Sequence, residues 1–470
     1  MNQMPAGIIA RLFRTSTRLA LIVTVESCRC SAPKTRDILL AAIALPMADH
    51  ACHAVPLTLW DLSSPTLLDA LPSPIPNASW KSLRDHLLPN GVAGNVHAYT
   101  SETGLFPFFS PGVFGVLGSS GSPDIVPRPP ADLQAPIGTV LSRMKCMGAS
   151  CSGRGGYFTY YSARMAEVRA GRLVQAVHSP VGEALGSYAL AVAPRTGTTA
   201  LAHVWLGSTA ACTPLHYDAA ANVLTQVLGE KIVTLYPPEA VAAAGLMPWA
   251  STLQRSARTG WDGVASARAA IGGHVARIFR LAPGDALLIP AYWLHHVCAV
   301  GESNTNGSTP SLSVSLWAES AAQLEARALL AEPLPAALTG RYSDEDHIAI
   351  VTRLFVLLSG RYANAAAAAL RSRYAGLQKR SDHSIIVCSR NRNVLDEEGS
   401  KMWLMRASRA LAAQVSTAAR IIVIANWAEE ALLRALRMSR APPAAAYRRA
   451  LQQASLANTV MACFQHKNIE

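Results

Sequence analysis

The chain has 470 residues, of which 50% are hydrophobic and 15% are charged, and its formal net charge is +12. This hydrophobic content excludes a disordered chain, and the length allows one large or two modest domains with a sizeable core. The excess of Lys and Arg is spread singly through alanine-rich stretches and forms no run. A solvated basic surface is therefore favoured, while nucleic-acid binding is an alternative that is not favoured.

Residues 1–54 are predicted to be poorly ordered or to act as a targeting segment. Arg11, Arg14 and Arg18 precede the first acidic residue, Glu26, and Ser and Thr lie among them. That composition is typical of an organellar transit peptide, although a cytoplasmic or nuclear location is the favoured prediction. The longest apolar runs are shorter than the about 18 residues of a membrane span, so no membrane partner is expected.

Residues 55–154 are predicted to form the N-terminal part of the folded region and are rich in Pro, Ser and Gly at their start. A short amphipathic helix is predicted at 80–88 and a strand at 96–100. The glycine-rich stretch 148–156 lacks the Gly-Lys-Ser/Thr of a phosphate-binding loop. We therefore interpret it as a connection to the strand that follows.

Two distant segments carry side chains of the types that hold a catalytic metal. The first contains His216 and Asp218, and the second contains His295. Residues two apart on an extended segment point to the same side, so His216 and Asp218 can share one metal. Two imidazoles and one carboxylate are the ligand set of a non-haem Fe(II) oxygenase. His-x-Asp alone is a weak signal, so the interpretation depends on the residues around it.

Those surrounding residues predict a series of strands. Residues 219–238 indicate two strands of apolar and β-branched residues, separated by a turn at Gly229. An apolar run follows Gly284 and ends at Pro290, and residues 311–317 alternate between polar and apolar. Lys231 lies just after the turn, where a cation can neutralise an anion held beside the metal.

These motifs resemble the JmjC/cupin-like family of Fe(II)- and 2-oxoglutarate-dependent oxygenases. The likeness is carried by Thr-Pro-x-His-x-Asp, which begins at Thr213, and by Gly-Asp-x-Leu-x-Ile-Pro-x-x-Trp-x-His, which begins at Gly284. It is strongest to the protein-hydroxylase branch that includes the asparaginyl hydroxylase of the hypoxia-inducible factor. The resemblance implies a mainly β fold with helical additions. Its core would be a double-stranded β-helix (a jelly roll or cupin of JmjC type) over residues 155–320, followed by C-terminal helices.

The resemblance also implies the roles of individual residues. Fe(II) would be held by His216, Asp218 and His295. Lys231 would pair with the distal carboxylate of 2-oxoglutarate, helped by Thr213 and by a tyrosine from an earlier strand. Tyr160 is chosen for that tyrosine over Tyr157 and Tyr161. Further residues expected at the cofactor site are Asn222 and Trp317.

The implied activity is hydroxylation of a protein side chain, with 2-oxoglutarate converted to succinate and CO₂, so a protein substrate is the expected partner. Demethylation of N-methyl-lysine, hydroxylation of a tRNA base, and a catalytically silent cupin that only binds partners are the alternatives. His296 is a competing metal ligand, although on a strand it would face away from His295. Ser315 departs from the asparaginyl hydroxylase, which has Asn at the matching position near the cosubstrate.

The remaining segments are predicted from composition and position. Residues 239–280 form an insert that we expect to line the substrate cleft, with Trp249 or Trp261 near its opening. Residues 321–377 are predicted as C-terminal helices. Those within 344–377 match the position of the dimer element of the asparaginyl hydroxylase. Their apolar residues suit a homodimer and an ordinary core equally, so a homodimer is one of two predictions. Residues 378–470 form a basic, alanine-rich and partly helical tail that the resemblance does not cover.

Nine cysteines are scattered along the chain without any Cys-x-x-Cys pair. The odd number and irregular spacing indicate neither a disulfide framework nor a zinc ribbon. Reduced thiols in a reducing compartment are therefore predicted, and such a compartment also suits an Fe(II) enzyme.

Overall fold

The computed structural model describes the strands and helices of the chain and leaves segments between them undescribed. The described residues are 8–15, 18–25, 64–68, 95–107, 130–145, 157–164, 201–240, 244, 271, 273–301, 303–304, 307–308, 310–318, 324–325, 328, 351, 354–355, 357–373, 398–412 and 417–435. The predicted helix at 80–88 and the tryptophans at 249 and 261 lie outside them.

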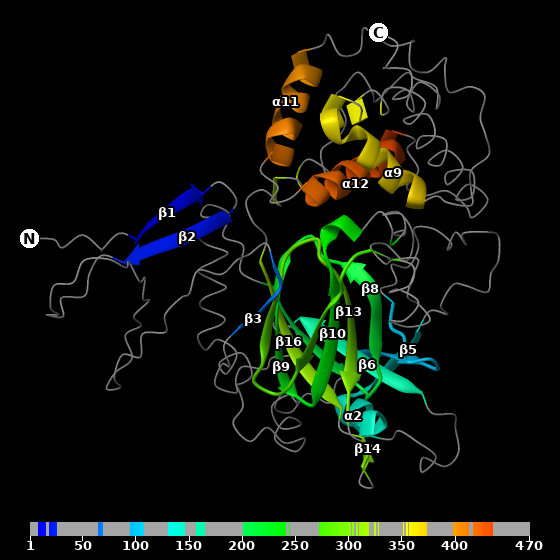
Figure 1. Ribbon diagram of the computed structural model, residues 1–470. Helices are drawn as coiled ribbons and strands as arrows, with labels where there is room; N and C mark the ends of the chain where they lie inside the picture. The colour runs from blue at the N-terminus through cyan, green and yellow to red at the C-terminus, as the bar shows by residue number, and fades with distance from the viewer. Residues whose placement is uncertain are drawn as a thin grey trace, which may run out of the picture.

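Two antiparallel sheets form the main body of the protein (Figure 1). The larger contains β3 (Thr66–Leu68), β4 (Asn95–Ser101), β5 (Ala131–Pro136), β6 (Phe158–Arg164), β7 (Leu201–Gly207), β9 (Ala221–Leu228), β12 (Ala286–Ile289) and β16 (Ser311–Ala318). The smaller contains β8 (Cys212–Tyr217), β10 (Glu230–Tyr236), β11 (Arg277–Leu281) and β13 (Leu294–Val300).

The strand order is that of a jelly roll. The larger sheet runs β3-β12-β9-β16-β7-β6-β4-β5 and the smaller runs β11-β10-β13-β8. From β7 to β16 the chain therefore crosses repeatedly between the sheets, with β7, β9, β12 and β16 in the larger and β8, β10, β11 and β13 in the smaller. The consecutive strands β10 and β11 are neighbours within the smaller sheet. This is the predicted double-stranded β-helix fold, and the remaining strands extend the larger sheet beyond β7 and β12.

Local sequence explains how the strands begin and end. Gly229 has a φ of +65° between β9 and β10, and a Cβ there would lie 2.7 Å from the carbonyl oxygen of Pro310, so a side chain is excluded on both grounds. β16 alternates Ser and apolar residues as predicted, and all residues from Ser311 to Leu316 are buried. The interior between the sheets is filled by Leu224, Val233, Leu235, Leu281, Leu287, Ile289 and Trp293.

Helices cover one end of the barrel (Figure 1). They include α9 (Ala363–Arg373), α11 (Glu398–Ala412) and α12 (Thr417–Ala435). Their buried residues belong to one core cluster with Tyr217 of β8 and Leu294 of β13. Within that cluster the amide of Asn426 on α12 donates a hydrogen bond of 2.8 Å to the Tyr217 hydroxyl. Helices of the predicted basic tail thus share a core with the strands.

Three of the apolar residues behind the homodimer prediction lie in the same cluster. Val351, Leu354 and Phe355 are at most 1% exposed and pack within this chain. An apolar helix face of this kind is equally typical of a monomer core. The homodimer stays a prediction, because the structure contains one chain.

The remaining elements are short. β1 (Ile8–Thr15) and β2 (Arg18–Val25) form a hairpin with Thr15 opposite Arg18, within the segment predicted to be poorly ordered or to act as a targeting segment. Their β-branched and apolar residues favour extended structure over a coil. The others are α2 (Ile137–Lys145), β14 (Ser303–Asn304), β15 (Gly307–Ser308) and the 3₁₀ turns η2 (Pro238–Ala240) and η4 (Gly360–Tyr362). Within the described part of the chain, each helix is too short or too polar to cross a bilayer.

Candidate metal and cosubstrate site

The three predicted metal ligands meet where β8 pairs with β13. His216 lies directly opposite His295 in the register of the two strands, and Asp218 follows the end of β8. One donor atom from each side chain lies within 4.8 Å of the other two, and His295 Nε2 is 3.7 Å from Asp218 Oδ2. Three donors so spaced can contact one ion at the about 2.0–2.2 Å typical of nitrogen and oxygen ligands.

Both imidazoles are oriented by their own strands. His216 Nδ1 lies 2.8 Å from the carbonyl oxygen of Pro214, and His295 Nδ1 lies 2.9 Å from that of Trp293. A carbonyl accepts only from N–H, so each Nδ1 carries the proton and each Nε2 presents its lone pair to a metal. Neutral imidazoles and a carboxylate suit Fe(II) and leave positions for other ligands. The donor set therefore fits the iron that the resemblance implies.

The carboxylate is also held in place. Trp317 Nε1 on β16 donates a hydrogen bond of 3.2 Å to Asp218 Oδ2, and the backbone N–H of Tyr292 donates one of 2.7 Å to the Asp218 carbonyl. Asn222 pairs with Trp317 across β9 and β16. Its side-chain oxygen is buried and has no hydrogen-bond partner among the described residues. A buried amide oxygen beside the metal ligands is therefore free to accept a hydrogen bond from a bound molecule.

Lys231 faces the same interior as the metal ligands. On the regular β10–β13 pairing, Lys231 is opposite Ala299 and Leu235 is opposite His295, so alternation puts Lys231 and His295 on one face. Lys231 is 4% exposed, and its ammonium donates a hydrogen bond to Ser313 on β16. Burial lowers the pKa of Lys231 to about 7. A buried ammonium with a neutral partner is a site for an anion.

Tyr160 and Thr213, which were predicted to help Lys231 bind the cosubstrate, make contacts with other residues. The Tyr160 ring stacks on Phe106 at 5.1 Å between centroids, and burial raises the pKa of its hydroxyl, so it stays a hydrogen-bond donor. The Thr213 hydroxyl donates a hydrogen bond of 3.4 Å to the Val297 carbonyl. Among the hydrogen bonds of these described residues, none joins Lys231 to Tyr160 or Thr213.

An aromatic cluster inside the barrel was not predicted. Trp205 on β7 lies 6.1 Å from Tyr160 and 5.6 Å from Trp317 between ring centroids, and His203 lies 4.8 Å from Trp317. The Trp205 indole N–H is buried and has no hydrogen-bond partner within the described region. His203 and Trp205 are two apart in an apolar strand, so alternation puts both rings on one face of β7. That spacing was the signal in the sequence that could have predicted the cluster. The cluster connects the Tyr160 strand to the Trp317 that holds Asp218.

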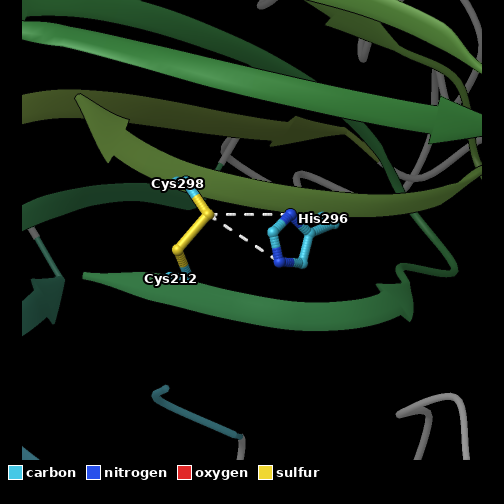
Figure 2. Close-up of side chains that lie close together, drawn as sticks. All are labelled: Cys212, His296 and Cys298. Carbon is cyan, nitrogen blue, oxygen red and sulfur yellow. Dashed lines mark hydrogen bonds between the residues drawn. A yellow bond between two sulfur atoms is a disulfide. The ribbon is translucent and has the colours of Figure 1, made fainter. Parts of the chain in front are cut away.

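The opposite face of the same strand pair carries a second group of ligand-type side chains. Cys212 and Cys298 are opposite each other in the β8–β13 register and form a disulfide, with 4.1 Å between their Cα atoms. The prediction of reduced thiols is wrong for this pair in the structure, because strand pairing brings together two cysteines 86 positions apart. His296 lies beside them, as Figure 2 shows. Burial and the neighbouring His295 lower the pKa of His296 to about 4, so its ring is neutral at pH 7.

Known proteins share the segment that builds this barrel. Residues 162–322 match the cupin-like domain family. The chain is 38% identical over 89 residues to tRNA wybutosine-synthesizing protein 4 of Emericella nidulans, which is 19% of this chain and 8% of that protein. It is 32% identical over 117 residues to Lysine-specific demethylase JMJ30 of Arabidopsis thaliana, which is 24% of this chain and 25% of that protein.

A third relative extends the same pattern. The chain is 33% identical over 119 residues to Jumonji C domain-containing protein 5 of Drosophila melanogaster, which is 24% of this chain and 27% of that protein. The chain thus spans no more than 27% of the length of these relatives. The matches support a cupin-like domain of JmjC type. They do not confirm the narrower resemblance to the asparaginyl hydroxylase of the hypoxia-inducible factor.

Proposed function

We propose that the protein is an Fe(II)- and 2-oxoglutarate-dependent oxygenase that hydroxylates a side chain of a protein substrate. The observation that carries the proposal is the convergence of His216, Asp218 and His295 on one barrel face that also buries Lys231. The likeness to JmjC-domain proteins supports an oxygenase of this type at the level of the family.

The residues divide into those that would hold iron and those that would hold the cosubstrate. His216, Asp218 and His295 are the proposed iron ligands, and the Trp317 N–H fixes the direction of the carboxylate. The Lys231 ammonium would neutralise one carboxylate of 2-oxoglutarate, a dianion. Pairing with this carboxylate would also offset the cost of burying the Lys231 ammonium, which donates a hydrogen bond to the neutral Ser313 hydroxyl.

With iron and 2-oxoglutarate bound, the site would supply O₂-dependent oxidation of a substrate C–H bond, coupled to release of succinate and CO₂. The protein contributes position and a dry interior. Tyr160, Trp205 and Trp317 bring aromatic rings together on the inner face, which would limit the access of water to the reacting atoms. The Tyr160 hydroxyl remains a donor at neutral pH for a carboxylate held nearby.

The choice of a protein side chain follows the resemblance to the protein-hydroxylase branch. Two relatives are named for lysine demethylation and for tRNA modification, so those chemistries are the alternatives. The products distinguish them. A hydroxylated peptide gains one oxygen atom, a demethylated lysine loses a methyl group as formaldehyde, and a tRNA substrate carries the added oxygen on a base. Mass spectrometry of peptides, methyl-lysine peptides and tRNA incubated with the enzyme separates the three.

The test of enzyme against silent scaffold is succinate release from 2-oxoglutarate with added Fe(II). We expect the wild type to release succinate and His216→Ala to release it at least about 100-fold more slowly. Removal of a group that only supports a metal ligand lowers activity by about 10–100-fold, and removal of the ligand itself should cost more. His97→Ala is the matched control, because His97 is an exposed histidine on β4 paired with Asp132. Equal release by His216→Ala and wild type would refute the iron assignment. Release that does not depend on iron would also refute the iron assignment, and no release by the wild type would leave the silent scaffold.

A further inference from the structure

A second cluster of metal-ligating side chains lies on the outer face of β8 and β13. Lys231 is opposite Ala299 and points inward, so by alternation His296 and Cys298 point outward from the same strand. Cys212 joins them because it is opposite Cys298 on β8. One ligand atom from each of the three residues lies within 4.8 Å of the other two. Figure 2 shows the sulfur atoms and the imidazole facing one another.

The distance between the histidine nitrogens and the Cys298 sulfur is close to that between two ligands of a tetrahedral ion, and a turn of the imidazole would aim one nitrogen at the ion. The Cys298 sulfur is 3.7 Å from each ring nitrogen of His296. Tetrahedral zinc, with Zn–S of about 2.3 Å and Zn–N of about 2.0–2.1 Å, requires a sulfur–nitrogen separation of about 3.6 Å. The same geometry requires about 3.8 Å between two sulfurs. Breaking the disulfide moves its two sulfurs apart toward that separation.

We propose that Cys212, His296 and Cys298 form a zinc site when the disulfide is reduced, and that the disulfide is its oxidised, metal-free form. Reduction adds two electrons and two protons to the bond between the sulfurs and gives two thiols, with a dithiol or a phosphine as the electron donor. Zn²⁺ then replaces the two thiol protons and accepts a lone pair from His296. Two thiolates and one imidazole are a soft donor set that favours zinc over the hard cations.

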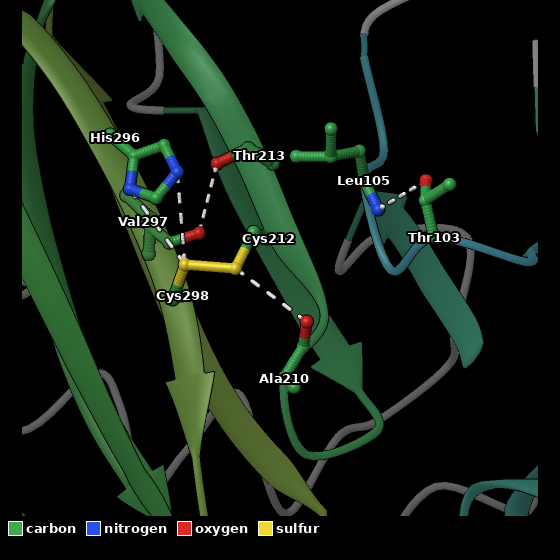
Figure 3. Close-up of a disulfide and its surroundings, with 8 residues drawn as sticks. All are labelled: Thr103, Leu105, Ala210, Cys212, Thr213, His296, Val297 and Cys298. Carbon is green, nitrogen blue, oxygen red and sulfur yellow. Dashed lines mark hydrogen bonds between the residues drawn. A yellow bond between two sulfur atoms is a disulfide. The ribbon is translucent and has the colours of Figure 1, made fainter. Parts of the chain in front are cut away.

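The surroundings allow this exchange. Both cysteines are half-buried, so a reductant can reach the sulfurs, and His296 is buried beside them with 4% exposed. The Cys212 sulfur lies 3.5 Å from the carbonyl oxygen of Ala210, at the end of the strand pair (Figure 3). The site lies on the face opposite the proposed iron ligands, and it does not rest on the proposed oxygenase activity.

Cobalt(II) absorption tests the site, because cobalt substitutes for zinc and thiolate ligands give a charge-transfer band in the near ultraviolet. The full-length protein is reduced with tris(2-carboxyethyl)phosphine, freed of metal and titrated with Co²⁺. We expect one equivalent of the band in the wild type and its loss in the Cys212→Ser/Cys298→Ser double variant. Asp218→Ala removes a ligand from the group of His216, Asp218 and His295, which contains no sulfur, so it should keep the band. Cys388→Ser is the matched control for thiols elsewhere in the chain.

Alkylation of the reduced wild type gives an independent readout that needs no variant. Zn²⁺ should slow the reaction of Cys212 and Cys298 with iodoacetamide by at least about tenfold, measured by peptide mass spectrometry, since the thiolate lone pairs are bound to the metal. His296→Ala should weaken zinc binding by at least about 100-fold, because a lost ligand costs more than the 10–100-fold of an outer-shell group. Absence of the cobalt band, persistence of the full band in the double variant, or equal alkylation with and without Zn²⁺ would overturn the proposal.

Discussion

Lys231 puts a positive charge inside the barrel, and its replacement tests both folding and the proposed cosubstrate. The Lys231 side chain is 4% exposed, and its ammonium donates a hydrogen bond to the neutral hydroxyl of Ser313. Burial lowers the pKa of Lys231 from 10.5 to about 7. Lys231→Met keeps the apolar stem and removes the charge. The variant should therefore unfold less readily than the wild type and should bind 2-oxoglutarate more weakly.

The size of the stability gain depends on pH in a definite direction. Below pH 7 the lysine is protonated in the folded and the unfolded chain, so the whole cost of burying the charge is present. A pKa lowered from 10.5 to about 7 corresponds to roughly 5 kcal/mol. The lost hydrogen bond to Ser313 offsets about 1.5–3 kcal/mol of this, which leaves a gain of about 2–3.5 kcal/mol at pH 6.

Above pH 7 the destabilisation of the wild type by the buried charge decreases. From there to pH 10.5 only the unfolded chain keeps the proton, so the wild type becomes more stable as pH rises and the penalty vanishes above 10.5. The advantage of Lys231→Met should be about 3 kcal/mol smaller at pH 9 than at pH 6. Urea unfolding of the two proteins at both pH values measures it, and Lys401→Met on the exposed face of α11 is the control. An advantage that does not change with pH would refute the reasoning.

Binding of 2-oxoglutarate should follow the same ionisation. A carboxylate pairs with the protonated lysine, so wild-type affinity should fall by up to about tenfold for each pH unit above pH 7. Calorimetric titration with Fe(II) replaced by Zn²⁺ measures the affinity without turnover. Lys231→Met should bind more weakly at and below pH 7 and lose this pH dependence, so the two affinities should approach each other as pH rises. Equal affinities of the two proteins at and below pH 7 would show that Lys231 does not contact the cosubstrate.

Three further substitutions test other parts of the structure. Cys298→Ser opens a disulfide that spans 86 positions, so chain entropy predicts a loss of up to about 4–5 kcal/mol in urea unfolding under oxidising conditions, and no loss would mean that the bond does not form in solution. Trp317→Phe removes the N–H that holds Asp218 and should weaken Fe(II) binding by about 10–100-fold, whereas unchanged affinity would mean that the carboxylate needs no such support. Asn426→Ala leaves the buried Tyr217 hydroxyl without this donor and should cost about 1–3 kcal/mol in a single unfolding transition, whereas a separate early transition would show that the C-terminal helices unfold independently.

The barrel and its proposed metal ligands could be predicted in part, because many of their signals are local. A glycine turn before Lys231, the alternation of β16 and the proline that ends β12 each specify one strand or boundary. His216 and Asp218 are two apart, so extended structure alone puts them on one side. The convergence with His295 required the family resemblance, because spacing within a segment does not reveal which distant strand pairs with it.

Features that depend on pairing could not be predicted. The register between β8 and β13 shifts between His295 and Val297, so Pro214 and Leu215 of β8 lie opposite the single residue His296. This irregularity lets His216 face inward while Cys212, four positions earlier, joins Cys298 on the outer face. Composition and cysteine spacing carry no trace of such a shift. The packing partners of α11 and α12 could not be predicted either, because an apolar helix face does not specify what it packs against.

In the β8–β13 pair, contacts within each strand orient the proposed iron ligands, and the register between the strands brings them together. Each proposed iron-binding imidazole is fixed by a carbonyl two residues earlier on its own strand, at Pro214 and at Trp293. Those contacts are local and survive any small movement of one strand against the other. The meeting of His216 with His295 depends instead on the register, which the sulfur pair on the opposite face also holds. A change of state at the sulfurs would thus alter the separation of the imidazoles while leaving the direction of each unchanged.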